Sequence, residues 1–172
     1  MLDRASIVDE QFLKRVSCAN FPNILSSTTP AMAGLDKKMA IDFFDSQIKS
    51  RLVDLIAREL KEKGLAYYTI GSSGHEGNVV FGYVFKATDM AFLHYRSGAF
   101  YLQRAKQVAE CDGVCDMLLS LLASANDPIS GGRHKVFGSV PLTIPPQTST
   151  IASHLPKALG AAFSITRAKE LG

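Results

Sequence analysis

Apolar residues recur at helical spacing from Lys37 to Lys63, with charged residues between them. Residues three and four positions apart share one face of a helix, so this pattern predicts a single long amphipathic helix. Gly64 follows Lys61 and Lys63 directly, as is typical of a helix C-terminus. The apolar positions of the predicted helix are Ile41, Phe44, Ile48, Leu52, Leu55, Ile56 and Leu60.

Five shorter segments also have a helical pattern. Serines before Glu76 and small residues after Ile151 mark two of the starts. The predicted helices lie within residues 1–20, after Glu76 through Val84, and at Ser97–Val108, Asp112–Ala123 and Ile151–Lys169. Residues 21–35 contain two prolines and a Ser-Ser-Thr-Thr run, a composition typical of linkers. We therefore predict an N-terminal extension and linker over residues 1–35, and one domain over residues 36–172.

Two short apolar runs end at polar or glycine-rich stops and predict strands. They are Tyr67–Ile70, which ends before Gly71, and Met90–His94. We expect a helix-rich α/β fold with two or three short parallel strands, about half of a doubly wound domain. Half a sheet leaves an open edge, so we also expect association or marginal stability in isolation.

Composition bounds the class of protein. The chain has 172 residues, of which 47% are hydrophobic, enough for one domain with a core. A net charge of +3 is too small to indicate nucleic-acid binding. Its basic residues Lys61, Lys63, Arg104 and Lys106 are predicted to lie on solvated helix faces. No apolar run is long enough to span a bilayer, and charges interrupt residues 1–19, so the start does not resemble a secretory signal.

The cysteines give a weak signal. Cys18, Cys111 and Cys115 are odd in number, which argues against a disulfide framework, and one Cys-x-x-x-Cys pair is a poor metal motif. We predict reduced cysteines in a cytoplasmic protein. His75 and Glu76 are adjacent and have no third ligand near them in sequence, so a structural role with amide contacts is predicted for Glu76.

Candidate binding residues occur in two segments of the chain. Tyr95-Arg96 follows the second predicted strand, and ligands bind at the carboxyl ends of strands in open α/β sheets. The arginine fork suits a diphosphate, although a surface Tyr-Arg pair is the simpler alternative. Thr148-Ser149-Thr150 precedes the last predicted helix, where hydroxyls cap free amides and such an end attracts a phosphate or carboxylate. An ordinary capped helix explains that pattern equally well.

A polar, glycine-rich loop precedes the hydroxyl-rich turn. Asp127-Pro128 and Gly131-Gly132 exclude regular structure there. The loop ends with three consecutive basic residues, Arg133, His134 and Lys135.

Several blocks in order resemble a known enzyme family. They are Tyr67-Tyr68-Thr69-Ile70-Gly71, Gly74-His75-Glu76-Gly77, His94-Tyr95-Arg96-Ser97-Gly98, the Arg-His-Lys-Val-Phe-Gly-Ser run from Arg133, and the run from Pro146 to Gly160. Together they resemble the α-type part of the thiamine-diphosphate-dependent dehydrogenase component of 2-oxo acid dehydrogenase complexes. The similarity is greatest to bacterial branched-chain (2-oxoisovalerate) enzymes with fused α and β parts, and it covers roughly Ile48 to Phe163.

This resemblance implies a fold and an activity. The fold would be an incomplete thiamine-diphosphate-binding domain, and the reaction is oxidative decarboxylation of branched-chain 2-oxo acids, with acyl transfer to a lipoyl carrier. The family binds magnesium through a Gly-Asp-Gly segment and a later Asn, which would follow Gly172. The chain is therefore expected to be an amino-terminal half, inactive alone. The implied partners are a β-type dehydrogenase part, separate or fused, and a lipoyl-bearing acyltransferase, within an oligomer.

The resemblance also implies site residues. By position, His94, Tyr95 and Arg96 would meet the cofactor diphosphate, and Ser149 and Ile151 would meet the cofactor near its thiazolium end. Three further positions match potassium ligands of some members, namely Thr148, Ser153 and His154. In the family the histidine after the arginine stands several residues later than His134. The alternative to an enzyme part is a non-catalytic helical interaction module, or a degenerate remnant of that enzyme.

Overall fold

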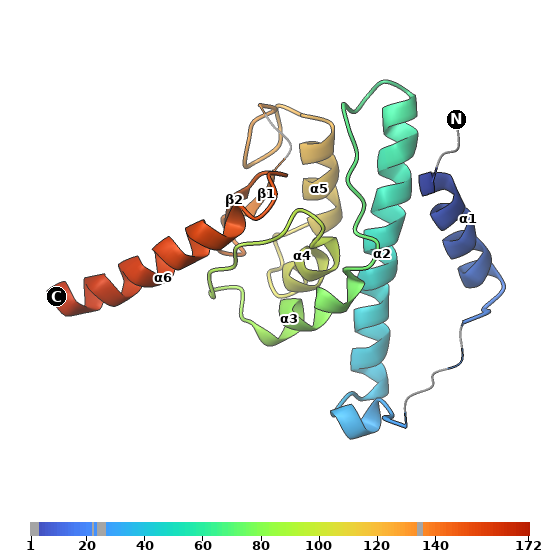
Figure 1. The fold of residues 1–172 in the computed structure, drawn as a ribbon, viewed down its shortest axis with the longest axis horizontal. Coiled ribbons are helices and arrows are strands. Elements are labelled where there is room, and N and C mark those ends of the chain that lie inside the picture. The colour runs from blue at the N-terminus through green and yellow to red at the C-terminus, as the bar shows by residue number, and fades with distance from the viewer. Residues whose placement is uncertain (1–3, 22, 24–26, 134–135) are drawn as a thin grey trace. The chain divides into compact units, whose positions relative to one another are not determined.

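The computed structural model describes residues 4–21, 23, 27–133 and 136–172. They fall into two compact units, Met1–Ala40 and Ile41–Gly172, each of which has its own internal contacts. The ribbon in Figure 1 is rich in helix and has little sheet. The helix-rich character expected from the sequence is thereby confirmed.

The first unit contains the predicted N-terminal helix. α1 runs Arg4–Ser17, and a 3-10 turn, η1, occupies Ala31–Ala33 within the predicted linker. The Asp36 carboxylate then accepts a hydrogen bond from the Met39 amide at 2.8 Å. This bond caps the start of the next helix, because the first amides of a helix lack partners within it.

The long predicted helix is confirmed as α2, Lys37–Glu62. Gly64 ends it with a φ of +73°, a left-handed conformation that glycine adopts without strain. The predicted apolar face is wrong in part, however. Ile41 is 57% exposed, and three more of its members are exposed as well, namely Phe44, Leu52 and Ile56.

The buried face of α2 includes Phe43 and Val53, but most of its residues are small or polar. Ser46 donates to Gln103 Oε1 at 2.8 Å, and Ser50 donates to Ser72 Oγ at 2.8 Å. A Cβ at Gly98 would lie 2.6 Å from Ser50 Oγ, so the backbone at Gly98 approaches this face of α2 closely. Hydrophobic periodicity misses such a face because its residues are buried through hydrogen bonds and close approach rather than apolar area.

Three short helices form the centre of the second unit. η2 (Glu76–Asn78) leads into α3 (Val79–Val84), and α4 (Gly98–Ala105) and α5 (Gly113–Leu121) follow. All three predicted helices in this region are confirmed, and the Asp112 carboxylate caps α5 by accepting from the Cys115 amide at 3.0 Å. Every residue of α4 is buried. The main core cluster consists of Leu93, Phe100, Tyr101, Ala105, Leu142 and Ile144.

The described sheet has two antiparallel strands, β1 (Phe137–Ser139) and β2 (Ile144–Gln147). The prediction of short parallel strands at Tyr67–Ile70 and Met90–His94 is therefore wrong, since neither segment is a strand. A strand requires hydrogen bonds to a partner backbone, and within the described residues the second segment makes one such bond to a distant segment, from Ala91 N to Thr143 O at 3.1 Å. The two prolines inside β2 cannot donate, which limits further pairing.

The last predicted helix is confirmed as α6, His154–Leu171, although it begins three residues later than expected. Its N-cap, Ser153, makes no side-chain capping bond. The hydroxyl of Thr148 lies 3.1 Å from that of Thr150, so the predicted capping of the helix by this turn is wrong. No helix among the described residues combines the length and the apolar content needed to cross a membrane.

Candidate functional site

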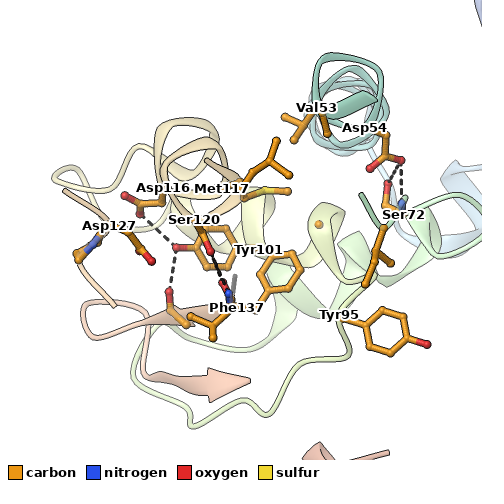
Figure 2. Close-up of a pocket in the computed structure, with 17 residues that line it drawn as sticks. Val53, Asp54, Ser72, Tyr95, Tyr101, Asp116, Met117, Ser120, Asp127 and Phe137 are labelled. Atoms are coloured by element: carbon orange, nitrogen blue, oxygen red, sulfur yellow. Dashed lines mark hydrogen bonds between the residues drawn. The ribbon is translucent and has the colours of Figure 1, made fainter. Parts of the chain in front are cut away.

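Two adjoining pockets meet at the side chain of Tyr95. The larger one holds about 660 Å³, counting the space open to solvent, and lies between α2, α4, α5 and β1 (Figure 2). Both pockets are lined by Ile70, Tyr95, Val136 and Phe137. The larger pocket is lined in addition by Val53, Asp54, Ala57, Ser72, Gly98, Tyr101, Asp116, Met117, Ser120, Leu121, Asp127, Pro128 and Gly138.

Three carboxylates make the larger pocket acidic. Burial raises the pKa of Asp54, against the opposing bonds from Ser72 and the charge of Arg51. Burial also raises the pKa of Asp116, whose Oδ2 accepts from the Tyr101 hydroxyl at 3.2 Å. Asp127 is 5% exposed. Arg51 offsets the charge of Asp54, but the described lining contains no basic side chain, so the larger pocket does not suit the charged end of such a cofactor.

The opposite walls of the larger pocket are held by separate hydrogen bonds. Figure 2 shows Asp54 bonded to Ser72 on one side and Tyr101 reaching toward Asp116 on the other. Asp54 Oδ2 accepts from the Ser72 amide at 2.8 Å, from its hydroxyl at 2.9 Å, and from Arg51 Nη1 at 2.6 Å. The loop that carries Gly71 and Ser72 is thereby fixed to α2.

The smaller pocket joins two of the predicted site residues. Tyr95 and Ser149 both line it, together with Tyr68, Ile70, Val136, Phe137 and Gln147. The hydroxyls of Tyr68 and Ser149 lie 3.2 Å apart. Residues far apart in the sequence therefore contribute hydroxyl groups to one concave site.

Gln147 is a residue of this pocket that the sequence analysis missed. It is 2% exposed, and its Nε2 donates to Ser153 Oγ at 2.5 Å. Its buried Oε1 has no hydrogen-bond partner among the described residues. An unpaired buried carbonyl oxygen is costly, and a cation or an N–H donor would satisfy it. The signal available in the sequence was its place beside the Thr-Ser-Thr turn, inside the run from Pro146 to Gly160.

Arg96 is held close to the pockets but does not line either one. Its guanidinium donates through Nη1 to the Gly71 carbonyl and lies 5.4 Å from the centre of the Tyr95 ring. A glutamate fixes the same part of the structure, because Glu76 Oε2 accepts from the Gly74 amide at 2.8 Å. The predicted structural role of Glu76 with amide contacts is thereby confirmed.

Three histidines meet beside Tyr95. The ring of His94 stacks on that of His75 with centroids 5.2 Å apart, and it meets His154 edge-on at 5.6 Å. His94 Nδ1 accepts from the Arg96 amide at 3.2 Å, so Nδ1 lacks a proton and Nε2 carries it in the neutral ring. Burial lowers the pKa of His94, and the charges of His75, His154 and Arg96 lower it further.

Four other predicted site residues line neither of the two pockets, namely Thr148, Ile151, Ser153 and His154. Ile151 is 79% exposed and lines neither pocket. Ser153 Oγ donates to the Thr150 carbonyl at 2.9 Å, while Thr148 bonds within its own turn. No group of three or more His, Cys, Asp or Glu side chains suited to a metal occurs in the part of the chain that the structure describes. His134 and Lys135 of the predicted basic loop lie outside the described residues.

Arg104 contradicts the prediction that it lies on a solvated helix face, because it is 0% exposed. Lys106, by contrast, is exposed and pairs with Asp42 at 2.8 Å and with Asp45 at 3.0 Å. The cysteines Cys18, Cys111 and Cys115 are free.

Comparisons of this chain with protein-family models, with curated proteins and with solved structures found no match. The resemblance to the thiamine-diphosphate-dependent dehydrogenases therefore rests on the sequence blocks alone. The family assignment stays a prediction.

Proposed function

We propose that this chain is part of a thiamine-diphosphate-dependent 2-oxo acid dehydrogenase and that it helps to anchor the diphosphate end of the cofactor. The observation that carries the proposal is the shared pocket of Tyr95 and Ser149. Those residues belong to two separate sequence blocks of the resemblance. The proposal therefore draws support from one pocket that joins them.

The donors around the smaller pocket fit a phosphate group. Tyr68 brings a hydroxyl that lies 3.2 Å from that of Ser149, the residue that the resemblance places near the thiazolium end. The nearby Arg96 brings a permanent positive charge, and its Nη1 donates to the Gly71 carbonyl. A guanidinium binds phosphate oxygens through charge-assisted hydrogen bonds, which are stronger than the bonds that a neutral hydroxyl adds. Gln147 Oε1, an acceptor without a partner in the described structure, fits a cation beside the phosphate, such as the predicted potassium.

Within this proposal the roles of the side chains are binding and positioning. Thiamine diphosphate, when bound, supplies the carbanion chemistry that cleaves a 2-oxo acid. Arg96 holds negative charge, Tyr95 supports the guanidinium through its ring, and the Asp54–Ser72 bonds keep the neighbouring loop in place. The fused or separate β-type part, magnesium and the lipoyl-bearing acyltransferase belong to the same proposal.

The test is calorimetric titration of thiamine diphosphate, with magnesium present, into the assembly of this chain with a β-type part. Arg96→Ala should weaken binding roughly 30- to 1000-fold, since losing a charge-assisted contact at a partly buried site costs about 2–4 kcal/mol. Arg96→Lys should recover part of the loss, because an ammonium lacks the planar fork.

The matched control is Arg167→Ala, an arginine on α6 with a 57% exposed side chain and an ion pair to Glu170. It should leave cofactor affinity unchanged. Arg104, although nearer in sequence, is unsuitable as a control because it is buried. Equal affinities for Arg96→Ala and Arg167→Ala would show that Arg96 does not hold the diphosphate.

A non-catalytic interaction module is the second candidate. It is favoured by the exposed apolar residues of α6, where Leu155, Leu159 and Phe163 are 60%, 73% and 69% exposed. An interaction module has no reason to bind the cofactor. Saturable cofactor binding that depends on Arg96 would therefore exclude it, while a protein partner without any cofactor affinity would favour it.

A further inference from the structure

A separate cleft opens beside α3 and α4, and most of its walls are apolar. It shares no lining residue with the two pockets around Tyr95. Several of its apolar side chains are open to solvent, with Phe81, Phe85 and Met90 56%, 48% and 49% exposed. The other lining residues are Asn78, Asp89, Ala91, Phe92, Leu93, His94, Ser97, Phe100, Arg104 and His154.

Arg104 places a buried positive charge in the wall of this cleft. Its Nη2 donates to the carbonyls of Lys86 and Asp89. Nε and Nη1 are buried and have no hydrogen-bond partner among the described residues. The carboxylate of Asp89 also lines the cleft and favours the charged form of Arg104, but its Oδ2 accepts from the Lys86 amide at 2.8 Å and the unpaired nitrogen atoms keep no hydrogen-bond partner in the described structure.

This arrangement is costly for the protein alone. A buried charge loses its hydration, and carbonyl dipoles replace only part of it. Burial accordingly lowers the pKa of Arg104. The guanidinium lies 5.5 Å from the centre of the Phe100 ring, which adds a weak cation–π contact but no counter-charge. An anion that reaches Nε and Nη1 would satisfy both donors.

The cleft adds two further groups that suit an anion. His94 and His154 line it, with their rings 5.6 Å apart. The Nδ1 of His94 already accepts a bond from Arg96, which leaves Nε2 as the donor of the neutral ring. A single arginine with two histidines matches one negative charge better than the two of a phosphate, and the exposed phenylalanines suit an apolar body.

We propose that the cleft binds a small carboxylate with an aliphatic tail, its carboxylate at the unpaired nitrogen atoms of Arg104 and its tail against Phe81, Phe85 and Met90. The cleft shares no lining residue with the pockets around Tyr95, although the resemblance assigns its residue His94 to the cofactor diphosphate, and binding at Arg104 needs no thiamine diphosphate. Its success or failure therefore does not decide the dehydrogenase proposal.

The experiment is calorimetric titration of the full chain with octanoate, and with 1-octanol and inorganic phosphate in parallel. Octanoate should bind saturably and at least about tenfold more tightly than either of the others, because only octanoate has both the charge and the tail. Octanol binding as tightly as octanoate would overturn the role of Arg104. Phosphate binding as tightly would overturn the role of the apolar wall.

Two variants locate the site. Arg104→Met keeps the length of the side chain and removes the charge, and it should weaken octanoate binding at least about tenfold. Since Arg104 also ties down two carbonyls, Phe85→Glu serves as the second variant: it places a repelling carboxylate at an exposed position of the cleft and should abolish binding in a folded chain. Phe163→Glu, the same change at a 69% exposed site on α6, is the control and should bind normally. Unchanged binding in the Phe85→Glu chain would place the octanoate elsewhere and refute the proposal.

Discussion

Asp54 holds together the two elements that frame the candidate site, so its removal is the most informative stability test. In Asp54→Ala the Ser72 amide and hydroxyl and Arg51 Nη1 would all lose the acceptor that they share at 2.6–2.9 Å. Arg51 is 4% exposed, so its charge would stay buried. Breaking a buried pair by removing one partner typically costs about 3–5 kcal/mol.

The structure narrows that range for Asp54→Ala. Arg51 Nε also lies 3.5 Å from Glu76 Oε1, which retains part of the compensation. We therefore expect the free energy of unfolding to fall by about 3 kcal/mol, toward the lower end of the range. Asp54→Asn keeps an acceptor for one donor but loses the charge, and it should cost about half as much.

The assay is urea unfolding followed by circular dichroism, which gives the free energy of unfolding from the midpoint and the slope. Asp45→Ala is the matched control, since Asp45 lies on the same helix with a 42% exposed side chain and pairs with Lys49 at 2.9 Å and with Lys106 at 3.0 Å, both near the surface. An exposed pair of this kind contributes less than about 1 kcal/mol. If Asp54→Ala and Asp45→Ala cost the same, the buried network does not stabilise the fold as argued.

Two further outcomes follow from the packing and from the histidines. Gly82→Ala should destabilise the chain by about 1–3 kcal/mol, because the added Cβ would lie 2.5 Å from the Phe100 carbonyl oxygen. Gly160→Ala on α6 is the control: its Cβ meets nothing within 4 Å, so it should be neutral or slightly stabilising in the same unfolding assay. The pKa of His94 is lowered in the fold by burial and by the charges of His75, His154 and Arg96. The stability that depends on neutral His94 is therefore present above the ordinary pKa of 6.5, and it is lost as the pH falls through the pKa of the folded state. The loss of stability between about pH 7.5 and about pH 5 should therefore be smaller in His94→Phe than in the unaltered chain, and equal losses would contradict the assigned cause.

Helices were predictable here because each carries its own signals. The run from Lys37 to Gly64 has periodic apolar residues, basic residues near its end and a glycine stop, and all of these act within one segment. Asp112 likewise caps α5 through a contact three residues away. Such interactions depend on neighbours in the sequence, so no knowledge of the rest of the fold is needed.

The sheet was not predictable in the same way, because pairing is decided by distant residues. Met90–His94 has the apolar content of a strand, but in the described structure its backbone makes one hydrogen bond to a distant segment, from the Ala91 amide to the Thr143 carbonyl. β1 and β2 instead pair with each other across a short turn. The prolines of β2 argue against a strand inside a sheet, yet they are tolerated in a two-stranded pair, in which each strand has a free edge. Local composition therefore favoured the wrong segments.

The candidate site depends on the same kind of long-range information. Tyr95 and Ser149 were chosen from sequence blocks, and the structure adds that they line one pocket. Gln147 lies within the run from Pro146 to Gly160 and Arg104 in no block, and neither was singled out as a site residue; each matters because burial leaves some of its polar atoms without a partner in the described structure. Burial is a property of the folded chain, because the same arginine on an exposed helix would keep its hydration and cost little. The two unpaired groups are accordingly the places where the fold, rather than any sequence motif, offers a ligand buried hydrogen-bonding atoms.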